Sequence, residues 1–322
     1  MLRIHDSPSM IDPVTLFFAL GVIAGLLRSD LKMSSGLYET LSVFLLVAIG
    51  LKGGVELARA EVAQLLWPIV IVALMGCGTP LVAYPVLRRL GRLSQPDAAS
   101  IAAHYGSVSV VTFAVCVSYL ARLAVPFEGH MAVFLVILEV PALAIGVLLA
   151  KGIGRETRWA VLAREVLCGK AVVLLTGSLL IGWISGADGL QGLERFYMDL
   201  FKGMLSLFLL GMGLITAARL EDVRRSGAFL VGFGILMPLV SAVGGVVVGQ
   251  ALGLSVGGTT LLATLYASAS YIAAPAAMRI AIPEANPALS IGAALGVTFP
   301  FNVFVGVPLY HWMATLAHRT GG

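Results

Sequence analysis

The 322-residue chain is 59% hydrophobic and only 12% charged, and its mean hydropathy is +0.97. Because soluble domains carry about 25% charged residues, this composition excludes an ordinary water-soluble domain and indicates a protein embedded in lipid. The net charge of +4 does not indicate nucleic-acid binding, because the basic residues lie between apolar runs and not along a stripe with aromatic partners.

Ten apolar segments approach the length of a membrane crossing, which takes about 20 residues per helix. In chain order they lie near 12–27, 36–51, 65–87, 98–120, 131–150, 170–186, 203–218, 228–252, 257–278 and 288–316. The sequence therefore predicts an all-α polytopic membrane protein with ten transmembrane helices. The N-terminal residues lack the pattern of a cleaved signal peptide, so we expect the first segment itself to direct insertion.

A short polar motif, Tyr-x-Ser-x-Ser, occurs once in each half of the chain. The copies are Tyr105–Ser109 and Tyr266–Ser270, and the shift of 161 residues between them is half of 322. Two further landmarks recur at similar shifts: Pro80-Leu81-Val82 as Pro238-Leu239-Val240, and Gly50-Leu51 as Gly213-Leu214. This order predicts a duplication, with residues 1–160 and 161–322 as two five-helix repeats. Because five is an odd number of crossings, the second repeat is expected to be inverted in the membrane.

The basic residues predict the orientation. Only seven of the 21 Lys and Arg residues lie on one side of the ten-helix topology; the other 14 lie in the loops after segments one, three, five, seven and nine, or beside them. By the positive-inside rule this larger set is cytoplasmic. We therefore expect a cell inner-membrane protein with both termini outside. The seven basic residues expected on the outside are Arg3, Lys52, Arg59, Arg122, Arg195, Lys202 and Arg319.

Both motif copies lie within apolar segments, where an interrupted helix would expose unpaired backbone amides. We expect the helices at 98–120 and 257–278, the fourth and ninth, to break there, and Pro275 favours the second break. Serine hydroxyls and helix N-termini suit a small anion. Packing of serines against helical carbonyls is the alternative interpretation. The predicted substrate-binding residues are Gly106, Ser107, Ser109, Ala267, Ser268 and Ser270.

Glu139 is the one acidic residue deep in an apolar run, and a carboxylate in lipid generally faces a cavity or a partner. Its expected role is as a cation ligand, a proton carrier or an acceptor for the neighbouring broken helix. Thr112 and Tyr271, which lie beside the two motifs, are further candidates for ion binding or coupling. His104 is interpreted as a packing residue. No hydrolase, P-loop or zinc-protease motif occurs in the sequence, so we expect a transporter and no enzyme.

Four stretches of the sequence resemble the SbtA-type sodium-dependent bicarbonate transporter family, and the resemblance runs over most of the chain. They are IGLKGGVELA (Ile49–Ala58), DAASIAAHYGSVSVVTF (Asp97–Phe113), EVPAL (Glu139–Leu143) and ASASYIAAPAAMRIAIPEANPALSIGAALG (Ala267–Gly296). The resemblance implies sodium-coupled bicarbonate uptake by an elevator-type movement of a core domain against a gate domain. It also implies a homotrimer and a cytoplasmic PII-like regulator, with no cofactor beyond sodium.

The second motif departs from the pattern of the resembled family. Where the family is expected to have Ser-Ser-Ser-Asp-Ile-Ser-Gly-Pro, this chain has Ser268-Ala269-Ser270-Tyr271-Ile272-Ala273-Ala274-Pro275. An acidic position and several hydroxyls are absent from it. Two alternatives therefore stay open: a proton- or sodium-coupled carrier of another small anion or organic acid, and a membrane sensor without transport activity.

Overall fold

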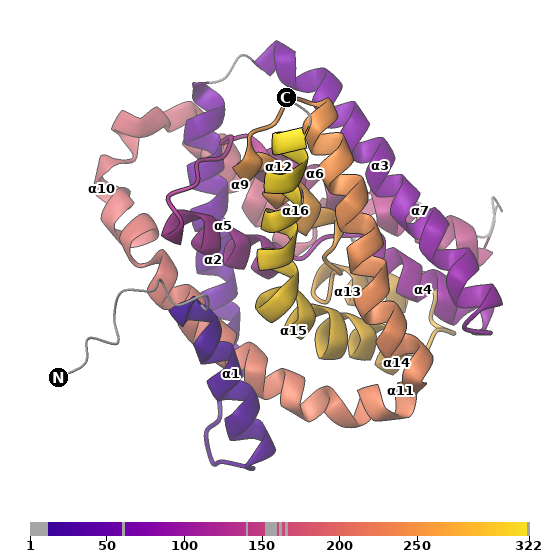
Figure 1. Cartoon of the computed structure of the whole chain (residues 1–322). Helices are drawn as coiled ribbons and strands as arrows, with labels where there is room; N and C mark the ends of the chain where they lie inside the picture. The colour runs from indigo at the N-terminus through magenta and orange to yellow at the C-terminus, as the bar shows by residue number, and fades with distance from the viewer. Residues whose placement is uncertain are drawn as a thin grey trace.

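The computed structural model describes residues 12–59, 62–139, 141–151, 160, 163–164 and 167–320. Residue 161, where the second repeat is predicted to begin, lies outside these ranges, as do Arg3, Val140, Arg155 and Arg158. Throughout the described ranges the regular secondary structure is helical (Figure 1). The all-α prediction is confirmed.

The helices follow the predicted apolar segments closely. In the first half they are α1 Pro13–Leu26, α2 Ser35–Ala58, α3 Val62–Arg89, α4 Gln95–Gly106, α5 Val110–Arg122, α6 Met131–Glu139 and α7 Pro141–Lys151. In the second half they are α9 Lys170–Gly189, α10 Gln191–Glu194, η1 Arg195–Asp199, α11 Phe201–Ala251, α12 Val256–Tyr266, α13 Ala273–Ala281, α14 Pro287–Ile291, η2 Gly292–Thr298, α15 Phe299–Phe301, η3 Asn302–Gly306 and α16 Val307–Thr320. The three η segments are π-helical turns.

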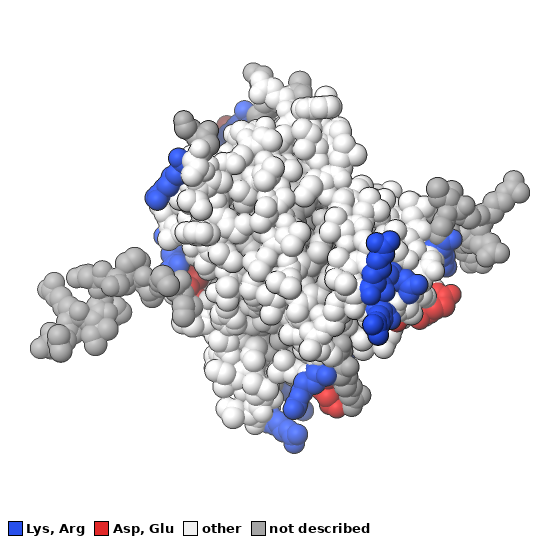
Figure 2. Space-filling model, turned by 45° about the vertical axis from the view of Figure 1, so that its right-hand side comes forward, with Lys and Arg blue, Asp and Glu red and all other residues white. Residues whose placement is uncertain are grey.

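Eight helical stretches among the described residues are long and apolar enough to cross a membrane, and α1 and α12 are shorter apolar helices. The face drawn in Figure 2 is a broad uncharged surface with Lys, Arg, Asp and Glu at its margins. This distribution fits a polytopic membrane protein, because lipid-facing surface cannot solvate charge. The count of ten crossings stays a prediction.

Helix α11 contains two predicted segments in one continuous element. Gly227 lies at their junction with φ 80°, a left-handed backbone conformation that glycine adopts without a Cβ clash. Two stretches flank this bend, and each is long enough to cross a membrane: Gln191–Glu221, which includes α10 and η1, and Gly227–Ala251. The bend therefore separates α11 into two halves with different neighbours.

The helices form two groups around the interrupted segments. The first bundle contains α1, α2, α9 and the first half of α11; α2 packs along α9, and α1 packs along α11. The second bundle contains α3–α7, the second half of α11 and α12–α16, where α4 packs on α3 and α7, and α12 on α11 and α16. Figure 1 places α1 and α2 on one side of the view and α3, α4 and α7 on the other.

Two pairs of glycines bring the helices of the first bundle into close contact. Gly21 of α1 packs on Gly213 of α11, and a Cβ on Gly21 would overlap the carbonyl oxygen of Leu210. Gly182 of α9 packs on Gly54 of α2, and a Cβ on Gly182 would overlap the carbonyl oxygen of Leu51. Small residues at such crossings allow the backbones to approach, which is a main source of helix association in lipid.

We predict that Gly182→Ala destabilises the protein by about 1–3 kcal/mol, the usual cost of overpacking a close contact. Gly177→Ala on the same helix is the matched control, because a Cβ there meets nothing within 4 Å. The comparison is thermal unfolding of the two purified variants in one detergent. Equal midpoints for Gly182→Ala and Gly177→Ala would contradict the packing described here.

Candidate functional site

The first interruption lies between α4 and α5. Helix α4 ends at Gly106 and α5 begins at Val110, so residues 107–109 leave the helix. Ser109 is the N-cap of α5, and its hydroxyl accepts a hydrogen bond from the amide of Thr112 at 3.2 Å. An N-cap serine satisfies one of the amides that have no carbonyl one turn earlier. The break predicted at the first motif is confirmed.

The second interruption lies between α12 and α13. Helix α12 ends at Tyr266 and α13 begins at Ala273, with Pro275 in its first turn. Proline is tolerated there because the first turn needs no amide donor. The Ser270 hydroxyl accepts a hydrogen bond from the amide of Ala274 at 3.2 Å. The break predicted at the second motif is also confirmed.

The two interruptions meet and satisfy each other's backbone. The Ser109 amide donates to the Ser268 hydroxyl at 2.9 Å, and the Ser270 amide donates to the carbonyl oxygen of His104 at 2.8 Å. The Ser268 hydroxyl in turn donates to the carbonyl oxygen of Leu265 at 2.8 Å. All of these serines are buried. Amides that would be unpaired in the membrane interior therefore find partners on the opposite break.

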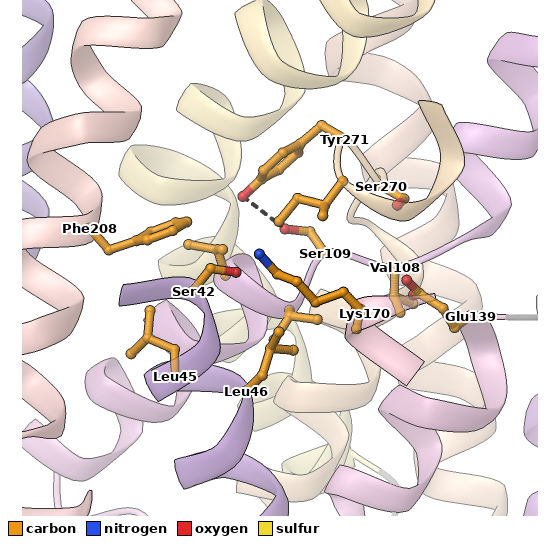
Figure 3. A pocket seen from close by; sticks show the side chains of 14 residues that line it. Ser42, Leu45, Leu46, Val108, Ser109, Glu139, Lys170, Phe208, Ser270 and Tyr271 are labelled. Carbon is orange, nitrogen blue, oxygen red and sulfur yellow. Dashed lines mark hydrogen bonds between the residues drawn. The ribbon is translucent and has the colours of Figure 1, made fainter. Parts of the chain in front are cut away.

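Ser109 is also the centre of a small hydroxyl network. Its hydroxyl accepts a hydrogen bond from the Thr112 hydroxyl at 2.9 Å and donates one to the Tyr271 hydroxyl at 3.3 Å (Figure 3). The Tyr271 ring packs edge-on against Phe299, with 5.3 Å between the ring centroids. This contact orients the tyrosine toward the first break. Thr112 and Tyr271 are therefore brought together around one serine.

Glu139 is the last described residue of α6 and lies beside the first break. It is buried, and one carboxylate oxygen accepts a hydrogen bond from the Ser107 hydroxyl at 3.4 Å. No Lys or Arg side chain of the described residues lies within ion-pair distance of this carboxylate. The carboxylate thus links α6 to the interruption, as the interpretation of Glu139 as an acceptor for the broken helix requires.

A cavity of about 20 Å³ lies directly beside the two breaks. Its walls come from α2, α6, α9, α11 and both interrupted segments (Figure 3). The lining residues are Ser42, Leu45, Leu46, Val108, Ser109, Val110, Val111, Glu139, Lys170, Ala171, Phe208, Ser270, Tyr271 and Ile272. Since a cavity needs about 10–15 Å³ of such volume to hold one water, the space has room for one or two water molecules.

The family model described as the Na+-dependent bicarbonate transporter superfamily matches residues 13–315. The chain belongs to this superfamily. The match covers all of the helices that line the cavity, and it confirms the resemblance carried by the four sequence stretches. A search of the curated proteins finds no matching relative. The paired breaks, the buried carboxylate and the small cavity are therefore features of a multi-pass membrane transporter.

Four of the nine predicted site residues of this transporter line the cavity: Ser109, Glu139, Ser270 and Tyr271. The other five are close to it, but they are not among the residues that line it. Ser107 and Thr112 bond to lining residues, and Ser268 joins the two breaks. Gly106 packs on Pro80 and Ala142, and the Ala267 carbonyl oxygen accepts a hydrogen bond from Asn302.

Polar residues of the last helical stretch support both breaks of the transporter. The Tyr105 hydroxyl bonds to the Thr298 hydroxyl at 2.7 Å, and Thr298 donates to the carbonyl oxygen of Gly234 at 2.7 Å. The Asn302 side chain donates to the Ala267 carbonyl at 2.9 Å and accepts from Tyr310 at 2.7 Å. Thr298 and Asn302 thus act as bonds between helices that hold the ends of α4 and α12.

Lys170 is a lining residue that the sequence reasoning missed. It is the first residue of α9, and Figure 3 shows its amino group directed toward Ser109 and Ser42. In the sequence it reads as an ordinary basic residue at the end of a loop, counted toward the orientation of the protein. Only the packing of α9 against α2 places it beside the breaks.

We predict that Ser268→Ala destabilises the transporter by about 1–3 kcal/mol, because it leaves the buried Ser109 amide without its acceptor. Ser206→Ala is the matched control, since that hydroxyl bonds only to the carbonyl of Gly203 in its own helix. Thermal unfolding in detergent measures both. An unchanged midpoint for Ser268→Ala would show that the bond across the breaks contributes nothing.

Proposed function

We propose that this transporter carries bicarbonate coupled to sodium, and that the substrate occupies the cavity between the two broken helices. The observation that carries the proposal is the meeting of the two breaks at a small cavity. The family supplies the chemical class of the cargo. The cavity supplies the size limit, because it favours an anion of few atoms over a larger organic acid.

The polar groups at the cavity suit an anion. Val110 and Val111, the first residues of α5, line it together with Ile272, the N-cap of α13. The first amides of a helix have no internal acceptor, and the helix dipole places partial positive charge there. The Ser270 hydroxyl accepts from Ala274, and no acceptor for its proton is recorded in the described structure. These N–H and O–H donors are available to bicarbonate oxygens.

Sodium would be carried beside the anion at Glu139. In the described part of the chain no group of three or more His, Cys, Asp or Glu side chains is placed to hold a metal ion. A carboxylate beside a hydroxyl oxygen offers the oxygen ligands that a hard cation prefers. Ser107 donates to Glu139 and belongs to the same break that lines the cavity, so cation and anion would occupy adjoining positions.

Two arrangements support an inverted repeat. The environment of Gly21 against Leu210 and Gly213 matches that of Gly182 against Leu51 and Gly54, at shifts of 161 residues for one helix and 159 for the other. Under this correspondence α1 matches α9, and α2 matches the first half of α11. Gly213 is then equivalent to Gly54. The sequence landmark instead matches Gly213 to Gly50, which lies one helical turn before Gly54.

The position of the cavity supports an elevator-type mechanism. Its walls are shared between the first bundle, through Ser42, Lys170 and Phe208, and the second bundle, through both breaks. Movement of the second bundle along the first would carry the site across the membrane. We further propose the inner membrane as location with both termini outside, which rests on the distribution of Lys and Arg along the chain. A homotrimer and a PII-like regulator are proposed from the family resemblance alone.

A second, larger cavity lies along the same interface. Its volume is about 590 Å³, and it is lined by Ala48, Ile49 and Lys52 of α2 and by Phe113 and Val117 of α5. On each of these two helices, the residues that line the larger cavity follow directly after those that line the small cavity. In the predicted orientation the far end of α2 is outside, so this cavity is the entrance that substrate would use.

Proteoliposomes containing the purified protein should take up labelled bicarbonate, faster with an inward sodium gradient than without. Ser270→Ala should lower uptake about tenfold, since it removes a hydrogen bond to a charged ligand. Ser109→Ala should lower uptake by a similar factor, about tenfold, because it removes the cap of α5 and the bond that orients Tyr271 beside the cavity. Ser206→Ala, with a hydroxyl that faces its own helix, should transport like the wild type. Absence of bicarbonate uptake in both sodium conditions would refute the substrate, and full activity of both serine variants would refute the site.

The alternative of a proton-coupled carrier of another small anion rests on the same buried carboxylate. The variant Glu139→Gln distinguishes sodium coupling from proton coupling. If sodium is the coupling ion, the variant should need at least about tenfold more sodium for half-maximal uptake, because one charged ligand is lost. The alternative would be favoured if wild-type uptake did not depend on sodium but increased with the pH gradient. Uptake by Glu139→Gln would then no longer depend on the pH gradient.

A further inference from the structure

The donors at the small cavity recognise the oxygens of an anion but not the rest of the molecule. The Ser270 hydroxyl and the first amides of α5 would bond to bicarbonate and to any carboxylate in the same way. Discrimination against longer anions must therefore come from the apolar walls, which limit the space behind those oxygens. A wall of this kind typically rejects one extra methylene by about 10- to 200-fold.

Tyr271 is the largest side chain that the second bundle contributes to these walls. Among the described second-bundle residues that line the cavity it is the only aromatic one, and the others are valine, serine, isoleucine and glutamate. Figure 3 shows Tyr271 on the opposite side of the cavity from Leu45 and Leu46 of α2, with its hydroxyl directed toward Ser109. The ring therefore occupies space into which a longer anion would otherwise extend.

The Tyr271 side chain is held at both ends. Its hydroxyl accepts a hydrogen bond from Ser109 at 3.3 Å, and its ring packs edge-on against Phe299, with 5.3 Å between the ring centroids. Phe299 is itself buried and packs edge-on against Phe18 of α1, also at 5.3 Å. The preceding residue, Ser270, is fixed to α4 through its amide. A ring supported in this way resists displacement by a larger ligand.

We propose that Tyr271 is the size filter of the site, which admits bicarbonate and anions of similar size and excludes longer carboxylates. The proposal rests on the proposed function, because it assigns a selectivity to the same cavity. In the proposed elevator movement the walls from the first bundle change, whereas Tyr271 travels with the donors and stays beside the anion. The aromatic ring carries this role, in contrast to the ion-binding role that the sequence predicts for Tyr271.

The test is ligand-dependent thermal stabilisation of the purified protein in lipid nanodiscs at constant sodium, pH and ionic strength. Bicarbonate is titrated beside acetate, propionate and butyrate, which share a carboxylate and differ by single methylenes. The readout is the size ratio, defined as the butyrate concentration divided by the acetate concentration that gives the same rise in unfolding temperature. Because both ligands bind through a carboxylate, the size ratio cancels any change in stability or carboxylate binding that a variant causes.

In the wild type the size ratio should be at least about ten, because the extra methylenes of butyrate meet the ring. Tyr271→Ala should lower it to about one or less, since the space left by the ring accepts the longer chain. Tyr271→Phe keeps the ring and loses the hydroxyl, so its size ratio should stay within about threefold of the wild type. Tyr197→Ala is the matched control and should equal the wild type, because Tyr197 stacks on Phe44 and lines a separate groove.

The outcomes separate the size filter from the proposed function. A wild-type size ratio near one, or equal ratios for the wild type and Tyr271→Ala, would overturn the filter, and stabilisation by bicarbonate would leave the proposed function intact. A size ratio lost in Tyr271→Phe as fully as in Tyr271→Ala would overturn the role of the ring. The expected ratios without any stabilisation by bicarbonate would support Tyr271 and refute bicarbonate. No stabilisation of the wild type by any of these anions would overturn the filter.

If Tyr271→Ala does not yield folded protein, Tyr271→Leu replaces it. Leucine keeps an apolar contact with Phe299 but fills less space than tyrosine. The size ratio of Tyr271→Leu should be at least about fivefold lower than that of the wild type. An unchanged size ratio in this variant would overturn the proposal.

Discussion

The structure depends on one constraint: backbone amides in the membrane interior must be satisfied without water. Two helices stop in the middle of the protein, and each exposes amides that an unbroken helix would have paired. The interruptions solve this together, because Ser109 donates to Ser268 and Ser270 donates to the His104 carbonyl. Neither break could exist alone at this depth without leaving a buried donor unpaired.

This mutual dependence accounts for the supporting elements. The carbonyl ends of α4 and α12 are held by bonds to the last helical stretch, through Thr298 and Asn302. Their opposite ends begin with serine caps at Ser94 and Ser255. With both interrupted helices fixed at each end, the amides left at the starts of α5 and α13 are held facing one cavity. The donors are therefore oriented before any ligand arrives.

The breaks were predictable from sequence because a polar motif that recurs at half the chain length, inside apolar segments, is typical of paired discontinuous helices. Ser109, Ser270, Tyr271 and Glu139 follow from that motif and from the cost of a carboxylate in lipid. Gly106 and Ala267 share the motif but pack or bond away from the cavity, since Gly106 is still the last residue of α4 and Ala267 caps α12 in a helical conformation, before the chain reaches the cavity. Lys170 was missed because its position depends on the register of α9 against α2, which no local pattern contains.

The most direct test is solid-state NMR of the protein labelled with ¹⁵N-serine, in bilayers with ¹³C-bicarbonate and sodium. Dipolar recoupling between ligand carbon and serine nitrogen reports whether the anion lies beside the interrupted segments. The account predicts dephasing of the bound bicarbonate signal that disappears when Ser109 and Ser270 are both replaced by alanine. Bound bicarbonate that shows no dephasing by serine nitrogens would place the anion elsewhere and contradict the central claim.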